Sequence, residues 1–363
     1  MTRATQQLSE LGVSVWLDDL SRTALNSGEL DRRITELDVV GVTTNPAIFA
    51  TAITSDSAYR EGVLAARGEG LNASETVFRL ASEDVAQACD LLEPVYRKSG
   101  GQDGRVSIEV DPKHANDREA TVQQATELWN SINKPNLMIK VPATEAGIVA
   151  TADLLGRGIS VNVTLIFGIT QYRRVLNAYL TGLEQARARG LDLAGIHSVA
   201  SFFVSRFDTL VDPLLPADSE LRGKGAIANA NIAYTVWQQT FESARAKTLL
   251  ALGANRQRLL WASTGVKNDA YPQDLYITEL IGRDTVNTLP PATLEFFAET
   301  EQPLSVKLGE NTVTSKHVLD EIARSGIDYG ETVAQLLDEG LEKFDTAWLQ
   351  LLQTVESELA RTE

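Results

Sequence analysis

A single lysine interrupts an apolar stretch in the middle of the chain. Residues 136–144 read Asn-Leu-Met-Ile-Lys-Val-Pro-Ala-Thr, so Lys140 follows three apolar residues and stands just before Pro142. Apolar runs of this kind form the buried strands of parallel sheets, and proline suits the exit from such a strand because it lacks a backbone N–H. A lysine there either extends its ammonium to water or to an ion-pair partner, or uses its amine as a nucleophile. By itself the segment favours the first role.

Polar side chains also stand at the ends of other short apolar segments. They comprise carboxylates, hydroxyls, amides and two cations: Asp18, Asp19, Thr43, Thr44, Asn45, Glu109, Asp111, Asn162, Thr164, Ser201, Ser205, Arg206, Ser263, Thr264, Lys267, Asn287 and Thr288. An isolated carboxylate in a buried strand, such as that of Glu109, is energetically costly. Such a set, together with Lys140, indicates a functional site if the fold brings the segment ends together.

Eight apolar segments are predicted strands, and amphipathic segments alternate with them. The strands are Val13–Asp18, Val39–Thr44, Arg105–Asp111, Leu137–Val141, Ile159–Leu165, His197–Val204, Arg258–Thr264 and Asp284–Leu289. Helices are predicted at Ser74–Arg97, Arg118–Asn130, Thr170–Arg189 and Ala226–Leu252, and Ser74 is the expected N-cap of the first. This alternation predicts an α/β fold, a (β/α)₈ TIM barrel, whose active site forms at the carboxyl ends of the strands. An open doubly wound sheet is the alternative, although no Gly-x-Gly-x-x-Gly follows the first strand.

The chain is predicted to be a single domain over residues 1–363, because no segment has the composition of a linker. Beyond the barrel, additional helices form an extension over about 313–363. One helix is expected at Val313–Ser325, and apolar residues spaced by three and four from Glu331 onwards predict one long amphipathic helix. We expect the extension to pack on the outside of the barrel; in the alternative, the long helix also reaches over the barrel mouth.

The composition excludes several classes of partner. With 33 Lys and Arg against 49 Asp and Glu, the net charge of −16 argues against nucleic acid or an anionic membrane surface, but not against a small anionic substrate. The single cysteine, Cys89, cannot form an internal disulfide, which fits a reducing compartment. Without a signal-like or membrane-spanning run, a cytoplasmic location is expected. The three histidines are scattered and show no metal-ligand spacing.

Five motifs together resemble the transaldolase family. They are Trp-Leu-Asp-Asp-Leu-Ser-Arg at 16–22, Gly-Val-Thr-Thr-Asn-Pro at 41–46, Ile-Glu-Val-Asp-Pro at 108–112, Met-Ile-Lys-Val-Pro-Ala-Thr at 138–144 and Asn-Val-Thr-Leu-Ile-Phe at 162–167. The resemblance runs over roughly residues 10–300 and is strongest to bacterial, including actinobacterial, members. It implies a class I aldolase-type barrel of the non-oxidative pentose phosphate pathway, without metal or organic cofactor. Such enzymes move a dihydroxyacetone unit from sedoheptulose 7-phosphate to glyceraldehyde 3-phosphate, giving erythrose 4-phosphate and fructose 6-phosphate.

The resemblance also implies roles for individual residues. Lys140 matches the lysine that forms a Schiff base with the ketose. Asp18 matches the acid/base that takes the proton of the C4 hydroxyl, with Asp19 as the alternative if the alignment shifts by one residue. Glu109 and Thr164 match a pair that holds a catalytic water.

Further residues match the substrate-binding positions of the family: Thr43, Asn45, Asn162, Ser201, Phe203, Arg206 and Lys267. The two asparagines would bind the dihydroxyacetone hydroxyls, and Thr43 would line the same wall. Ser201 and Arg206 would begin the phosphate subsite, with Phe203 packed nearby. Lys267 replaces the arginine of many relatives in a longer turn, which makes its phosphate contact the weakest of these expectations.

Two other functions remain open. An aldolase that splits fructose 6-phosphate to free dihydroxyacetone would use the same chemistry, but such relatives tend to be shorter and lack the long carboxyl-terminal helix. A non-catalytic sugar-phosphate sensor would need Arg206 and the asparagines, but not Lys140, Asp18 and Glu109 together. Small sugar phosphates are the expected partners, and both a monomer and a homodimer are compatible with the sequence.

Overall fold

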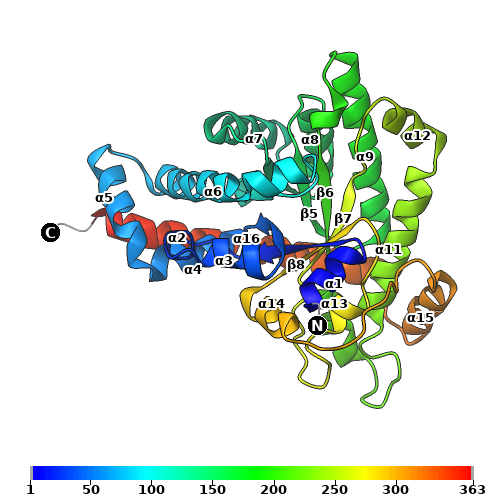
Figure 1. Ribbon diagram of the computed structural model, residues 1–363. Coiled ribbons are helices and arrows are strands. Elements are labelled where there is room, and N and C mark those ends of the chain that lie inside the picture. Colours follow the sequence, from blue (N-terminus) through cyan, green and yellow to red (C-terminus); the bar gives the residue numbers. More distant parts are fainter. Residues whose placement is uncertain (1–2, 361–363) are drawn as a thin grey trace.

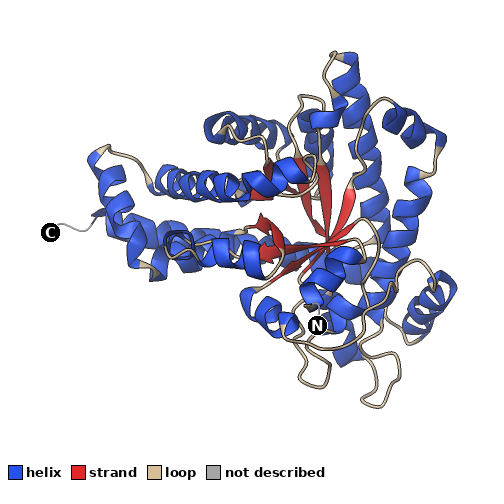
Figure 2. Ribbon diagram, viewed as in Figure 1, coloured by secondary structure: helices blue, strands red, loops and turns tan. Residues whose placement is uncertain are grey.

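The predicted barrel is confirmed in the computed structural model, which describes residues 3–360 (Figures 1 and 2). Eight parallel strands follow one another around a closed barrel, and the last strand pairs with the first. The strands are β1 Val13–Asp18, β2 Val39–Thr43, β3 Arg105–Glu109, β4 Leu137–Pro142, β5 Val161–Ile166, β6 Ser198–Phe203, β7 Arg258–Ala262 and β8 Thr285–Leu289. All begin within two residues of the predicted positions.

Helices surround the strands. The α-helices are α1 Ala4–Glu10, α2 Arg22–Asn26, α3 Glu29–Glu36, α4 Pro46–Ser55, α5 Arg60–Gly68, α6 Ala73–Lys98, α7 Arg118–Ile132, α8 Glu145–Leu155, α9 Ile169–Ala188, α10 Ser205–Val211, α11 Gly225–Phe241, α12 Ala244–Ala251, α13 Leu275–Thr278, α14 Pro291–Ala298, α15 Thr312–Arg324 and α16 Tyr329–Ala360. Short 3₁₀ helices lie at η1 Ser57–Tyr59, η2 Pro112–His114, η3 Leu193–Gly195 and η4 Asp212–Leu214.

Two helix predictions were wrong in detail. Helix α6 is capped by Asn72 rather than Ser74: the Asn72 side chain accepts from the Glu75 backbone N–H, and the Glu75 carboxylate accepts from the Asn72 N–H in a capping box. The single helix expected over Ala226–Leu252 is two helices, α11 and α12. The break occurs because the Ser243 hydroxyl accepts from the Ala246 N–H and starts a new helix there.

The strand register brings three of the predicted site residues into one row. Glu109 on β3 is the partner of Lys140 on β4, and Lys140 is the partner of Asn162 on β5. Thr164 lies two residues beyond Asn162, and alternate residues of a strand share a face. The barrel therefore places Glu109, Lys140, Asn162 and Thr164 side by side at its carboxyl end.

Close packing fills the opposite end of the barrel. The ring of Trp16 is fully buried, and its indole N–H donates to Asp103 at 3.3 Å. Asp103 also accepts from Arg258 at 2.8 Å. A Cβ atom on Gly41 would lie only 2.5 Å from the Trp16 ring, so only glycine fits at this point of β2. This network supports the strands from beneath the site.

The long helix α16 returns to the barrel after the last strand. Figure 1 shows α16, in orange to red, running alongside α4 from the barrel toward the carboxyl end of the chain. Helix α16 packs closely on the barrel at Gly340, because a Cβ there would lie 3.2–3.5 Å from atoms of Leu165, Phe167 and Arg206. These contacts agree with the alternative interpretation, in which the helix also reaches over the mouth.

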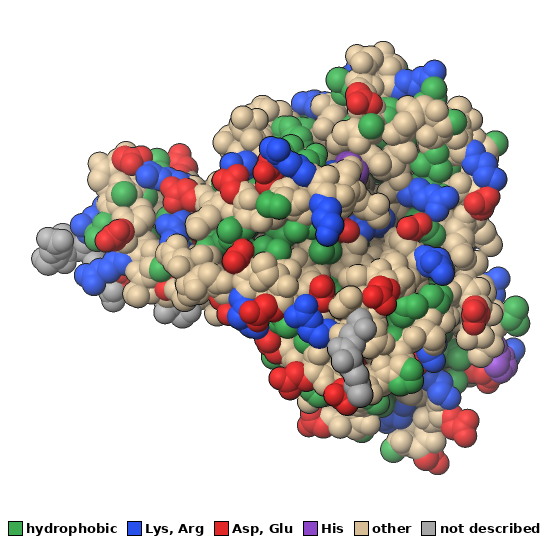
Figure 3. Space-filling view, viewed as in Figure 1, with side chains coloured by type: hydrophobic (Ala, Val, Ile, Leu, Met, Phe, Trp, Pro, Cys, Tyr) green, Lys and Arg blue, Asp and Glu red, His purple; other side chains and the backbone are tan. Residues whose placement is uncertain are grey.

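The surface is charged without a dominant patch on the face shown in Figure 3, where acidic and basic side chains are interspersed. No helix within residues 3–360 has both the length and the apolar character that crossing a bilayer requires.

Candidate active site

A cavity of about 340 Å³ opens at the carboxyl ends of the strands. Nine of the eleven predicted site residues line it: Asp18, Thr43, Asn45, Lys140, Thr164, Ser201, Phe203, Arg206 and Lys267. The other two lie directly behind lining residues. Glu109 forms an ion pair with Lys140, and the amide oxygen of Asn162 accepts from the Ser201 hydroxyl at 2.7 Å. The structure therefore brings the whole predicted set together.

Lys140 points from β4 into this cavity and is only 4% exposed. Its Nζ atom donates to the backbone carbonyl of Thr44 at 2.8 Å and lies 3.4 Å from Oε2 of Glu109. The Phe344 ring of α16 covers it, with Nζ 5.8 Å from the ring centroid. A buried amine next to proton acceptors and an open cavity can attack a carbonyl carbon.

Asp18 lies at the end of β1 on the same cavity wall. Its Oδ1 atom accepts a 2.8 Å hydrogen bond from the Thr43 hydroxyl, and Thr43 is in turn 2.7 Å from the hydroxyl of Thr288. Burial raises the pKa of Asp18, while the positive charge of Lys140 and the bond from Thr43 act in the opposite direction. A carboxyl in this environment is suited to take up and return a proton.

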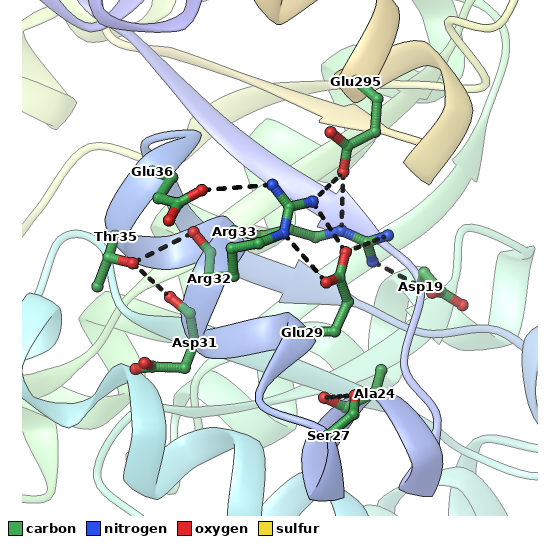
Figure 4. A network of polar contacts seen from close by, with 10 residues as sticks. All are labelled: Asp19, Ala24, Ser27, Glu29, Asp31, Arg32, Arg33, Thr35, Glu36 and Glu295. Atoms are coloured by element: carbon green, nitrogen blue, oxygen red, sulfur yellow. Dashed lines mark hydrogen bonds and ion pairs between the residues drawn. The ribbon is translucent and has the colours of Figure 1, made fainter.

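Asp19 belongs to a different environment. Its carboxylate forms an ion pair with Arg33 at 3.7 Å, and Arg33 also contacts Glu29 and Glu295 in the network of Figure 4. Asp19 does not line the cavity that contains Lys140. The geometry thus favours Asp18 over Asp19 as the residue that meets a ligand.

Glu109 and Thr164 flank the lysine from the neighbouring strands. Burial raises the pKa of Glu109 to about 7, against an opposing effect of the Lys140 charge. The hydroxyl of Thr164 and Oε1 of Glu109 are buried and have no hydrogen-bond partner within residues 3–360. Buried polar atoms of this kind normally find a partner, so both are suited to bind a water or a substrate hydroxyl.

The two asparagines are held by different contacts. The side-chain oxygen of Asn45 caps α4 by accepting from the Ile48 N–H at 3.0 Å, which leaves its NH₂ group for a ligand. Asn162 is fully buried; its NH₂ group donates to the Ser107 hydroxyl at 3.1 Å. Both side chains are therefore fixed before any ligand arrives.

Cations gather on the other side of the cavity. The Arg206 guanidinium packs on the Phe203 ring at 5.1 Å, and its Nη1 atom is buried without a hydrogen-bond partner in the described part of the chain. Burial lowers the pKa of Arg206. The side chain of Lys267 is exposed and lines the same cavity. Two cations beside the Ser201 hydroxyl suit a phosphate group.

Comparison with known proteins identifies the family. Residues 15–355 match the family model described as transaldolase/fructose-6-phosphate aldolase. The chain belongs to this family. It is 50% identical to the transaldolase of Kocuria rhizophila over 99% of both chains. It is 47% identical to transaldolase 2 of Streptomyces coelicolor, over 99% of this chain and 98% of the relative. It is 48% identical to the transaldolase of Mycolicibacterium smegmatis, over 97% and 96%.

Among the lining residues that sequence reasoning did not single out are Lys343 and Phe344 on α16. The apolar periodicity of α16 marked Phe344 as part of a buried stripe, but periodicity does not say what the stripe covers. Lys343 stands next to it and forms an ion pair with Glu339 at 3.6 Å, a typical surface pair. The only sequence feature that pointed to these two residues was the predicted long helix that contains them. The path of that helix over the barrel mouth depends on tertiary packing, which the sequence pattern does not show.

Proposed function

We propose that this protein is a transaldolase whose substrates are sugar phosphates. It transfers a dihydroxyacetone unit from sedoheptulose 7-phosphate to glyceraldehyde 3-phosphate, giving erythrose 4-phosphate and fructose 6-phosphate. The observation that carries the proposal is the buried Lys140 amine, placed in one cavity with Asp18 and beside Glu109, opposite Arg206 and Lys267. The names of the full-length relatives agree with this activity.

The reaction begins when the Lys140 amine attacks the C2 carbonyl of the ketose. Loss of one water gives a protonated imine, and Glu109 with Thr164 holds the water that carries the protons. Asp18 then takes the proton of the C4 hydroxyl as the C3–C4 bond breaks. The bonding electrons move to the imine, the aldose phosphate leaves, and an enamine remains on Lys140. The enamine carbon adds to the acceptor aldehyde, and water finally hydrolyses the new imine.

The binding residues divide this work. Asn45 and Asn162 hold the hydroxyls of the dihydroxyacetone unit, and Thr43 keeps the Asp18 carboxylate in place. Arg206, Ser201 and Lys267 bind the phosphate. A reducing compartment suits the protein, because its single cysteine, Cys89, is buried and cannot form an internal disulfide.

Chemical trapping tests the proposal. Borohydride reduction in the presence of fructose 6-phosphate should add the mass of a reduced dihydroxyacetone unit to the peptide that contains Lys140. Lys140→Arg keeps the charge but cannot supply the amine, so this variant should be inactive and unlabelled. A label on another lysine, or activity in Lys140→Arg, would contradict the proposal.

A coupled assay separates transfer from simple cleavage. A transaldolase forms sedoheptulose 7-phosphate when erythrose 4-phosphate is added to fructose 6-phosphate, whereas a fructose-6-phosphate aldolase releases dihydroxyacetone at the same rate with or without the acceptor. We expect product formation to depend on the acceptor.

A further inference from the structure

The residue that covers the Lys140 amine comes from the far end of the chain. Phe344 is 6% exposed, lines the cavity with Lys140, and places its ring centroid 5.8 Å from Nζ. The other groups close to Nζ are polar and come from the barrel: the Thr44 carbonyl at 2.8 Å and Glu109 at 3.4 Å. Phe344 thus gives this polar site an apolar side.

The ring is held in place along the whole helix. The buried stripe of α16 runs through Leu336, Gly340, Phe344, Trp348, Leu351 and Val355. Gly340, one turn before Phe344, approaches the barrel at Leu165. Trp348, one turn after it, packs on Phe78 with 5.1 Å between ring centroids. With both neighbouring turns fixed, Phe344 has little freedom to leave the lysine.

The enamine on Lys140, which exists only under the proposed function, has two fates. It can add to an acceptor aldehyde and complete the transfer. Alternatively, water protonates its carbon to give an imine, and a second water adds to C2 and expels the Lys140 amine, which releases free dihydroxyacetone. The second route needs water at the enamine, and excluding water from an active site suppresses hydrolysis of reactive intermediates.

We propose that Phe344 sets the ratio between these fates by keeping bulk water, as distinct from the single water held by Glu109 and Thr164, from the enamine on Lys140. An aromatic ring has no group that could deliver a proton, and it fills the space on one side of the nitrogen. Phe344 is therefore a specificity-determining residue, which makes the enzyme a transferase rather than an aldolase. The helix α16 is then part of the active site as well as part of the fold.

The test measures two rates in one protein preparation: dihydroxyacetone release from fructose 6-phosphate alone, and transfer to erythrose 4-phosphate. In Phe344→Ala the ratio of release to transfer should rise by about tenfold or more, because water reaches the enamine. In Phe344→Leu, which keeps an apolar cover, the ratio should stay close to that of the parent enzyme. The ratio does not depend on how much of the protein is folded.

Leu351→Ala is the matched control, since Leu351 is fully buried on the same stripe but does not line the cavity. It should lower stability and leave the ratio unchanged. Should Phe344→Ala fail to fold, Phe344→Ser, which likewise removes the apolar cover, provides the same measurement. An unchanged ratio in the Ala or Ser variant, or the same rise in Leu351→Ala, overturns the inference. A parent enzyme without transfer activity would instead overturn the proposed function.

Discussion

The amine of Lys140 donates a 2.8 Å hydrogen bond to the backbone carbonyl of Thr44, the residue that follows β2. An ammonium has three N–H groups and a protonated imine has one. The same carbonyl can therefore accept from the nitrogen before and after imine formation. Because a backbone acceptor does not titrate, the end of β2 fixes the position of the reacting nitrogen at every pH.

Asp18 and Asp19 are adjacent in sequence, but their substitution by alanine should have very different effects on the reaction rate. Asp18→Ala should lower the rate of carbon–carbon cleavage by about 10²–10⁴-fold, the range for loss of a general acid–base group. Imine should still accumulate on Lys140 and be trapped by borohydride. Asp19→Ala loses an ion pair with Arg33 and should stay active. If Asp19→Ala blocks cleavage instead, the assignment is off by one residue.

Glu109 should make stability depend on pH. Its ordinary pKa of 4.5 is raised to about 7 in the folded protein, so the folded state holds a proton that the unfolded state has lost between these values. This contribution therefore destabilises the fold as pH rises from 4.5 to 7. Glu109→Gln lacks this titrating group. Between pH 4.5 and 7, the free energy of unfolding of the variant should therefore rise relative to that of the parent, by at most about 1.4 kcal/mol per pH unit.

Denaturant unfolding at several pH values measures this difference. Above pH 7 the gap between the two proteins should become constant. A gap that does not change with pH between 4.5 and 7 would contradict a raised pKa for Glu109. The same variant should also form the imine more slowly, which separates its chemical role from its effect on stability.

Arg206 and Lys267 should affect kcat/KM for phosphorylated donors and not for unphosphorylated ones. A hydrogen bond to a charged group contributes roughly 1.5–3 kcal/mol, so each alanine variant should lose about ten- to hundredfold in kcat/KM on fructose 6-phosphate. Both should change little on free fructose. Arg206 should carry the larger share, because its planar guanidinium matches phosphate oxygens better than an ammonium does.

Lys343→Ala is the matched comparison, since Lys343 lines the same cavity but pairs with Glu339 on its own helix. It should have the smallest effect of the three. If Lys267→Ala leaves both donors unchanged, Lys267 is a surface residue and the phosphate subsite consists of Arg206 and Ser201.

Gly41→Ala should destabilise the barrel without touching the cavity. The added methyl group would meet the buried Trp16 ring at 2.5 Å, and overpacking of this kind costs about 1–3 kcal/mol. Gly68→Ala is the control, because no atom lies within 4 Å of a Cβ there. Thermal unfolding should show a lower midpoint for Gly41→Ala than for the parent protein. Gly68→Ala should leave the midpoint unchanged. Equal midpoints would show that the Trp16 ring can move aside.

The strands and the residues at their ends were predictable because each depends on a local signal. An apolar run marks a buried strand, and a polar residue at its end is unexpected enough to be noticed, as for Lys140 and Glu109. The closed barrel then follows from repeated strand–helix alternation. In a closed barrel the ends of the strands meet, so Asp18, Asn45 and Thr164 line one cavity although they are far apart in the sequence.

The missed features depend on competition or on tertiary contacts. Asn72 and Ser74 are both good helix caps, and the reciprocal bond from Glu75 decides for Asn72. The break at Ser243 interrupts a sequence that favours helix on both sides. No local signal shows that Phe344 covers Lys140, because the pairing joins residues that are far apart in the sequence.

The position of α16 in the chain has a consequence during protein synthesis. A ribosome completes β8, which ends at Leu289, before it makes Phe344. A nascent chain can therefore close its sheet while the nucleophilic lysine is still open to water. A chain cut short by a frameshift in this interval would contain every barrel strand and lack the cover over its amine. The order of translation thus makes the cover of the pocket last, after every strand of the barrel has been synthesised.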